Sequence, residues 1–140
     1  MKLCLVKTIK ISGRRGNSAN SKYRPDTIKM ALKDDKGKNY QICVRIGEQV
    51  MQSQRWIVGE DRVEIEPFEA ANGMVGIRLK RSASPAAKML SANAKSRGKM
   101  HTATIRFTCP ESTELLKDCF GKETVPFEQD GWLYAAWEVK

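Results

Sequence analysis

The stretch KGKNYQICVRI, residues 36–46, returns 61 positions later as RGKMHTATIRF, residues 97–107. Each copy begins with a basic residue, a glycine and a lysine, and after five further residues it ends in an arginine between two apolar residues. Gly37 and Gly98 suit tight turns, because glycine reaches backbone conformations that other residues avoid. Apolar residues that alternate up to each arginine are typical of a half-buried β-strand. The repeated stretch therefore predicts a basic turn followed by a strand, present twice.

Other elements accompany the repeated stretch in the same order. The matching pairs are Lys29-Met30 with Lys88-Met89, VEIEPFE (63–69) with TVPFE (124–128), and Asn72-Gly73 with Asp130-Gly131. Self-similarity in a shared order indicates a repeated structural unit. We therefore predict an internal duplication, with residues 25–80 as the first half of the chain and residues 81–140 as the second half.

Each half is expected to form a strand, a basic loop, a second strand, a short helix and a closing hairpin. The inward residues of the second strands are expected to be Ile42, Val44 and Ile46 in the first half, and Ala103, Ile105 and Phe107 in the second. The first helix is expected within Gly47–Ile57, with Gly59 as its stop. In the second half, Thr108–Glu111 is typical of a capping box that begins a helix ending at Gly121. Asn-Gly and Asp-Gly are strong hairpin signals. The fold class is thus mainly β, of α+β type, with short helices.

The two halves are expected to share one core, because a unit of about 55 residues is only marginally stable by itself. Residues 1–24 precede them as a separate region. Leu3–Ile11 alternates well enough to form a further strand, whereas Ser12–Tyr23 is rich in Gly, Ser and Asn and predicts a flexible basic loop.

Positive charge is concentrated in two segments. Residues 1–24 hold seven basic side chains and residues 80–99 hold six, and neither segment contains an acid, while the whole chain has a net charge of +9. Segregated charge of one sign is typical of a protein that meets a polyanion. Solubility alone is the competing interpretation of this charge.

Signatures of catalysis and of metal binding are missing from the sequence. The four cysteines form no C-x-x-C pair, and His101 is the only histidine, so we expect no metal site and no cofactor. No phosphate-binding loop, dinucleotide fingerprint or nucleophile elbow is present, and Cys109 at a helix start lacks a histidine at a motif spacing. No apolar run is long enough to span a membrane, and no secretory signal is recognised. We expect a non-enzymatic, cytoplasmic protein with reduced cysteines.

The order of elements resembles the AbrB/MazE/MraZ swapped-hairpin family of transcription factors and antitoxins. The residues that carry the resemblance are the loop Lys33–Lys38, the strand end Val44-Arg45-Ile46, the helix within Gly47–Ile57, the hairpin start Val58–Ile65 and the return strand Asn72–Arg78. The second half keeps the layout but has Gly121–Val125 at the hairpin start, and Gly47 stands where the family usually has a proline. The resemblance implies a β-barrel. Because members are usually homodimers, it also implies that this chain is a single-chain pseudo-dimer, monomeric or further paired.

The resemblance implies double-stranded DNA as the partner, bound through the basic loops and adjoining strands, and a role in transcription regulation. The implied contacts are Lys33, Lys36, Lys38 and Arg45 in the first half, and Lys95, Arg97, Lys99 and Arg106 in the second. Arg14 and Arg15, between glycines, could act as an arm that reaches into a groove. Arg45 and Arg106 could instead be solvated or paired with an acid from the other half. The alternative function is a protein-interaction module, an inhibitor or assembly factor, that binds an acidic partner. Trp56, Trp132, Tyr134 and Trp137 are expected to pack in the core or between the halves.

Overall fold

The structure, a computed structural model, describes residues 24–35 and 39–138, with the backbone alone described at 34, 35, 39 and 40. Two antiparallel sheets make up most of it. Sheet A has the order β6-β2-β1-β7, formed by Ala103–Phe107, Asn39–Ile46, Ile28–Asp35 and Glu123–Thr124. Sheet B has the order β5-β3-β4-β9-β8, formed by Lys88–Met89, Arg62–Glu69, Val75–Ser82, Trp132–Trp137 and Phe127–Gln129. The expected mainly β fold is confirmed, and neither sheet is closed on itself.

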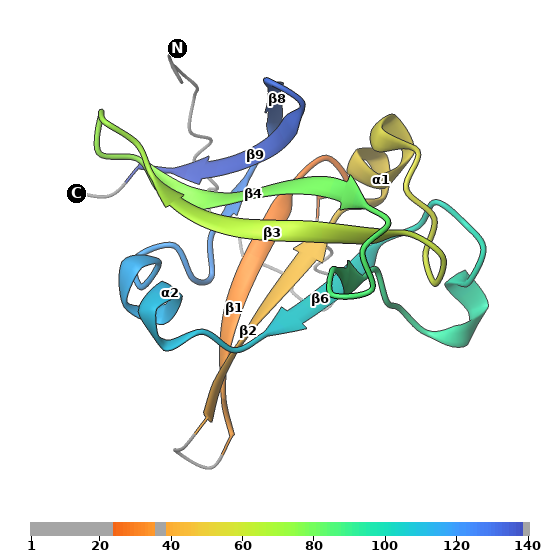
Figure 1. Cartoon of the computed structure of the whole chain (residues 1–140), viewed down its shortest axis with the longest axis horizontal. Helices are drawn as coiled ribbons and strands as arrows, with labels where there is room; N and C mark the ends of the chain where they lie inside the picture. Colours follow the sequence, from red (N-terminus) through yellow and green to blue (C-terminus); the bar gives the residue numbers. More distant parts are fainter. Residues whose placement is uncertain (1–23, 36–38, 139–140) are drawn as a thin grey trace.

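The two sheets pack on one core, and their strands cross. In Figure 1, β3 and β4 run across β1 and β2, and the β1–β2 hairpin extends beyond the rest of the molecule. Residues of sheet A such as Ile28 and Val44 and residues of sheet B such as Ile77 and Leu79 are all 0% exposed and belong to one buried cluster. The two helices α1 (Glu48–Gln54) and α2 (Pro110–Leu115) lie on opposite sides of the crossing (Figure 1). Buried residues of both sheets therefore form one cluster in the described part of the chain.

Alternation of apolar and polar residues sets the two faces of sheet A. The expected inward residues Ile42, Val44 and Ile46 are 0% exposed, as are Ile28 and Met30 on the neighbouring strand. β1 and β2 pair along their full length, from Ile28↔Ile46 to Asp35↔Asn39, so their inward residues lie opposite one another. Side chains of a strand point alternately to the two faces, and the residues between these apolar positions therefore face outward.

Both expected closing hairpins form. β3 and β4 are joined through the Asn72-Gly73 turn, and β8 and β9 through Asp130-Gly131. Gly73, Gly131 and Asp130 all have positive φ angles, which favour glycine and aspartate at these positions. Asn72 stabilises its turn through its side chain, which accepts a hydrogen bond from the Met74 amide at 3.1 Å.

Four local expectations are wrong. The helix α2 ends at Leu115, with Leu116 as its C-cap, and not at Gly121. The helix α1 ends at Gln54 and Arg55 caps it in the left-handed conformation, so Gly59 is not its stop. The N-cap of α2 is Cys109, whose side chain caps nothing, so the capping box at Thr108 does not form. The second half also lacks the expected strand–loop–strand hairpin before β6.

The segment before β6 forms no hairpin with β6, because its residues pair with strands of both sheets. Lys88–Met89 forms β5 on the edge of sheet B beside β3, and Ser91↔Thr104 is an isolated bridge to β6. Between Ser91 and β6 the chain makes a 3₁₀ turn, η2 (Ala94–Ser96). The expected N-terminal strand within Leu3–Ile11 and the loop Ser12–Tyr23 lie outside the described residues.

Substitution of Gly47 tests the join between β2 and α1. A methyl group there would overlap the carbonyl of Pro25 and lie 2.9 Å from the Thr27 carbonyl, which accepts a hydrogen bond from the Gly47 amide. We expect Gly47→Ala to lower the free energy of unfolding by about 1–3 kcal/mol in urea titrations. Gln49→Ala, at an exposed helical position, is the control and should change it by less than about 0.5 kcal/mol. Equal stabilities for the two variants would contradict this account.

Candidate nucleic-acid interface

Four basic side chains share the outer side of sheet A, which we call the cationic face: Lys29, Lys33, Arg45 and Arg106. Lys29, Arg45 and Arg106 lie beside buried apolar residues on their strands and so point away from the core. Lys33 is exposed and shares their face because it lies four residues after Lys29 on the same strand. Three of the four, Lys33, Arg45 and Arg106, are among the residues that the sequence implicates in DNA contact. The alternation in Ile28–Asp35 could also have revealed Lys29, which the sequence analysis missed.

The register of the strands orders these residues into rows. Lys29 pairs with Arg45, which pairs with Thr104, while Cys43 pairs with Arg106 in the next row. Lys33 pairs with Gln41 one row further toward the end of the β1–β2 hairpin. Neighbouring strands are about 4.8 Å apart and rows on one face about 6.8 Å apart, which places the Cα atoms of Lys33 and Arg106 roughly 12 Å from each other.

Arg45 and Arg106 have different surroundings. The Arg45 guanidinium lies 3.4 Å from the Glu123 carboxylate of β7, and the two side chains are only 13% and 14% exposed. Arg106 is exposed and forms no ion pair within the described part of the chain. The expectation of a partner acid from the other half is therefore confirmed for Arg45, whereas Arg106 is solvated. The sequence could not identify Glu123 as the partner, because their contact depends on how β7 pairs with β1.

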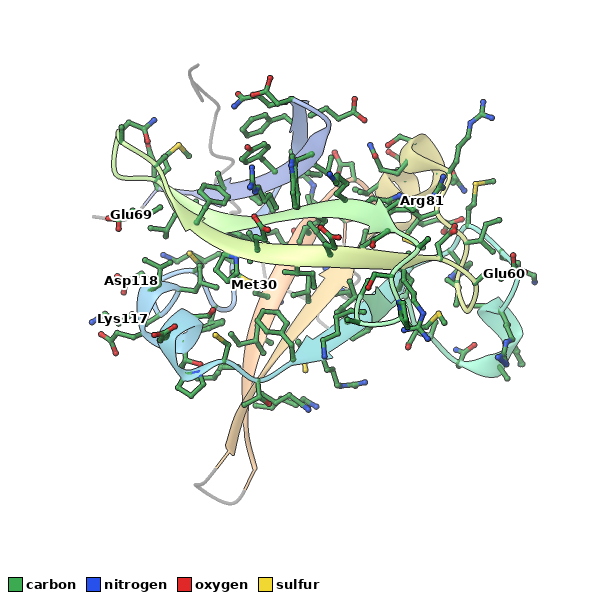
Figure 2. All side chains as sticks on the ribbon, viewed as in Figure 1. Met30, Glu60, Glu69, Arg81, Lys117 and Asp118 are labelled. Atoms are coloured by element: carbon green, nitrogen blue, oxygen red, sulfur yellow. The ribbon has the colours of Figure 1, made fainter. Side chains whose placement is uncertain are left out.

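The other basic loop of the prediction lies away from the cationic face. Lys95, Arg97 and Lys99 follow or belong to the η2 turn, which is held against the turn 57–61 by backbone hydrogen bonds: Val58 N to Lys99 O (2.9 Å) and Gly98 N to Val58 O (2.9 Å). The Arg97 side chain packs on Gly59. Figure 2 shows Glu60 and Arg81, which belong to this end of the molecule, on the side opposite Lys117 and Asp118. The β1–β2 hairpin, whose first strand carries Lys33, extends from another part of the molecule (Figure 1), so Lys33 and this segment do not lie side by side. Lys36, Lys38, Arg14 and Arg15 lie outside the described residues.

A second cluster of cations and aromatic rings lies on the outer side of sheet B, and sequence reasoning missed it. The Arg78 guanidinium donates to Glu66 at 2.7 and 3.0 Å and to the Tyr134 hydroxyl at 3.0 Å, and it lies 4.0 Å above the Trp132 ring. The hydrogen bond to Glu66 is the main cause that raises the pKa of Arg78 above its usual value. Lys80 lies 4.9 Å from the same ring. Trp56 and Trp137 are buried as expected, whereas Trp132 is half-buried under these cations.

The described cysteines are free thiols. Cys43 and Cys109 are half-buried, and the Ser112 hydroxyl donates to the Cys109 sulfur at 2.9 Å. Cys119 is buried, and this burial raises the pKa of its thiol to about 12. Within the described ranges no group of His, Cys, Asp and Glu side chains is arranged to hold a metal ion. The helices found there are all too short or too polar to cross a membrane.

The buried Cys119 thiol predicts a specific pH dependence. Because its pKa is raised on folding, the folded chain keeps this proton in a pH range where the unfolded chain loses it, so the stability contributed below about pH 9 is lost as the pH rises toward 12. We expect unfolding free energies between pH 8 and 11 to fall more steeply for the natural chain than for Cys119→Ala, by up to about 1.4 kcal/mol per pH unit. Cys43→Ala, the control, should keep the natural slope. Parallel curves for all three proteins would contradict this assignment.

Comparison of the chain with protein-family models, with curated proteins and with solved structures gave no match.

Proposed function

We propose that this chain is a double-stranded DNA-binding protein, with a role in transcription regulation, and that the cationic face contacts the phosphates. The observation that carries the proposal is the placement of Lys29, Lys33, Arg45 and Arg106 on one side of sheet A. Lysine and arginine contacts to phosphates supply most of the affinity of proteins for duplex DNA and fix their orientation on it.

We further propose that the two halves are copies of one unit related by an approximate two-fold axis, as in a homodimer of the AbrB type. If a strand of one half pairs with the equivalent strand of the other half across a two-fold axis, the two residues that lie opposite each other at the axis must be equivalent in sequence. β2 pairs with β6 around Val44↔Ile105, and these residues are equivalent at the offset of 61 found in the sequence. β4 pairs with β9 around Ile77↔Ala135, whose spacing equals that of the turns Asn72-Gly73 and Asp130-Gly131. Both centres support the proposed axis.

Contacts between different strands also occur in reciprocal pairs. Val63↔Lys88 joins the first half to the second through β3 and β5, and Ile28↔Thr124 does the same through β1 and β7. Two glycines with positive φ repeat the reciprocity, since Gly59 N donates to Leu90 O and Gly121 N to Met30 O, each at 2.8 Å. Exchange of edge strands in both directions supports the swapped arrangement that the family resemblance implies.

The sheets also adjoin at both edges, which supports the barrel of the family. Ser91, just after β5 of sheet B, bridges to Thr104 of sheet A. At the other edge only Val125 and Pro126 separate β7 of sheet A from β8 of sheet B.

The projecting β1–β2 hairpin gives the cationic face a shape that fits a duplex. A two-stranded β-ribbon is narrow enough to enter the major groove, which is about 12 Å wide. Lys33 lies two residues before the end of β1 at Asp35. The separation of roughly 12 Å between Lys33 and Arg106 would allow them to reach phosphates on the two sides of such a groove. We therefore propose that the hairpin enters the groove while Arg106 contacts its edge.

A fluorescence titration tests the proposal. It uses a labelled duplex of random sequence, a single strand of equal length and heparin, each at several salt concentrations. We expect micromolar or tighter duplex binding, and we expect Arg106→Gln to reduce the slope of log K against log salt by about 0.9, the value for one lost phosphate contact.

The matched control is Lys117→Gln, which removes an exposed positive charge beside α2 that is not on the cationic face (Figure 2). It should leave the slope unchanged. An equal loss for both variants would show that only net charge matters. Tighter binding of the single strand would refute the choice of duplex.

The cluster on the outer side of sheet B favours the second candidate, a protein-interaction module. Arginine, tryptophan and tyrosine dominate the energetic centres of protein interfaces, and Arg78 is already held in place by Glu66 and Tyr134. A poly-glutamate peptide in the same titration represents the acidic partner. The second candidate replaces the first if three results are obtained together: the peptide binds, Trp132→Ala weakens the binding of the peptide, and the nucleic acids do not bind.

A further inference from the structure

Arg45 and Arg106 occupy matching positions in the repeated stretches, so a symmetric pair of DNA contacts would require them to have matching neighbours. Their strands pair around Val44↔Ile105, directly beside both arginines. On the cationic face each arginine therefore lies opposite a small residue of the other strand, Thr104 for Arg45 and Cys43 for Arg106. To this point the two environments are alike.

The residues contributed by β7 and by the matching segment of the first half make the two environments different. Glu123, beside Arg45, is matched at the same offset by Arg62 in the first half. Arg62 is a cation and donates to the Ala87 carbonyl at 2.9 Å, so it supplies no acid to Arg106. One arginine is consequently held in an ion pair and 13% exposed, whereas the other is exposed and solvated.

The loops differ in the same manner. In the first half the β1–β2 hairpin extends from the molecule (Figure 1), and Lys33 on it is exposed. In the second half the corresponding segment folds back, and its Lys99 and Gly98 backbones are bonded to Val58. The solvated cations Lys33 and Arg106 thus lie toward the hairpin end of the cationic face, while Arg45 lies toward β7 with Glu123.

We infer that Glu123 withholds Arg45 from a bound polyanion, so that the cationic face grips duplex DNA at its Lys33–Arg106 end and prefers sites without two-fold symmetry. The inference rests on the proposed function and adds the class of site that the protein reads. A carboxylate at 3.4 Å competes directly with a phosphate for the guanidinium, because both offer oxygens to the same donors. The Arg45 side chain is also only 13% exposed, so a phosphate would have to compete with Glu123 for a guanidinium that is largely covered.

Salt slopes of duplex binding by the full chain test the competition. Removal of the carboxylate in Glu123→Gln should release Arg45 and make the slope of log K against log salt steeper by about 0.9, the value for one added phosphate contact. Arg45→Gln should leave this slope unchanged. In Arg45→Gln with Glu123→Gln the slope should return to that of the natural chain, because the gain requires the arginine. Glu114→Gln, which removes an exposed acid paired with Lys117, controls for the loss of one negative charge and should not alter the slope. Circular dichroism verifies that each variant is folded at the temperature of the titration.

Several outcomes would overturn the inference while the proposed function stands. These are duplex binding with equal slope losses for Arg45→Gln and Arg106→Gln, equal slopes for Glu123→Gln and Glu114→Gln, or a raised slope that persists in the double variant. Selection from a random duplex pool gives an independent readout: enriched sites should lack two-fold symmetry, and palindromic sites would refute this prediction. If no duplex, single strand or heparin binds at low salt, the proposed function and this inference both fail.

Discussion

The pairing of β2 with β6 is the constraint on which the rest of the structure depends. It joins the two halves within one sheet and fixes which residues of both strands face the core. Val44 and Ile105 lie opposite each other at 0% and 2% exposure, so a slip of one residue would bring Arg45 or Arg106 into the interior. A buried, unpaired guanidinium costs far more than the packing of one apolar residue contributes. The register, the core and the cationic face are therefore set by the same contact.

The arginines on the outer sides of the two sheets differ in how many partners they have within the protein. On sheet B, Arg78 makes an extended network with Glu66, Tyr134 and Trp132, which uses most of its hydrogen-bonding capacity. On sheet A, Arg106 has no such network in the described residues, and its side chain is left to water. A cation with its partners already in place stabilises a surface or packs against another protein. A solvated cation can exchange water for phosphate at little cost, which is why the two surfaces suggest different partners.

The sequence predicted well what depends on local pattern. The alternation around Val44 gave β2 and its buried residues, and the turns at Asn72-Gly73 and Asp130-Gly131 gave both closing hairpins. It predicted poorly what depends on competition between distant segments. The glycine turn at Gly98 looks like that at Gly37, yet its segment bonds to the turn 57–61 instead of forming a hairpin. The same limit applied at the site, since Arg45 and Arg106 are alike in sequence and differ only because β7 places Glu123 beside one of them.

The completion of both sheets by residues late in the chain has a consequence for its synthesis. β1 has β7 on its free edge, and β4 has β9, so both sheets are completed by residues from 123 to 137. A growing polypeptide that has reached only β4 would present these open edges, and open edges are templates for aggregation. Folding is thus expected to finish only after residues 123–137 have left the ribosome, and its rate is expected to be limited by these long-range pairings. The nascent first half would be the stage at which the protein most needs a chaperone.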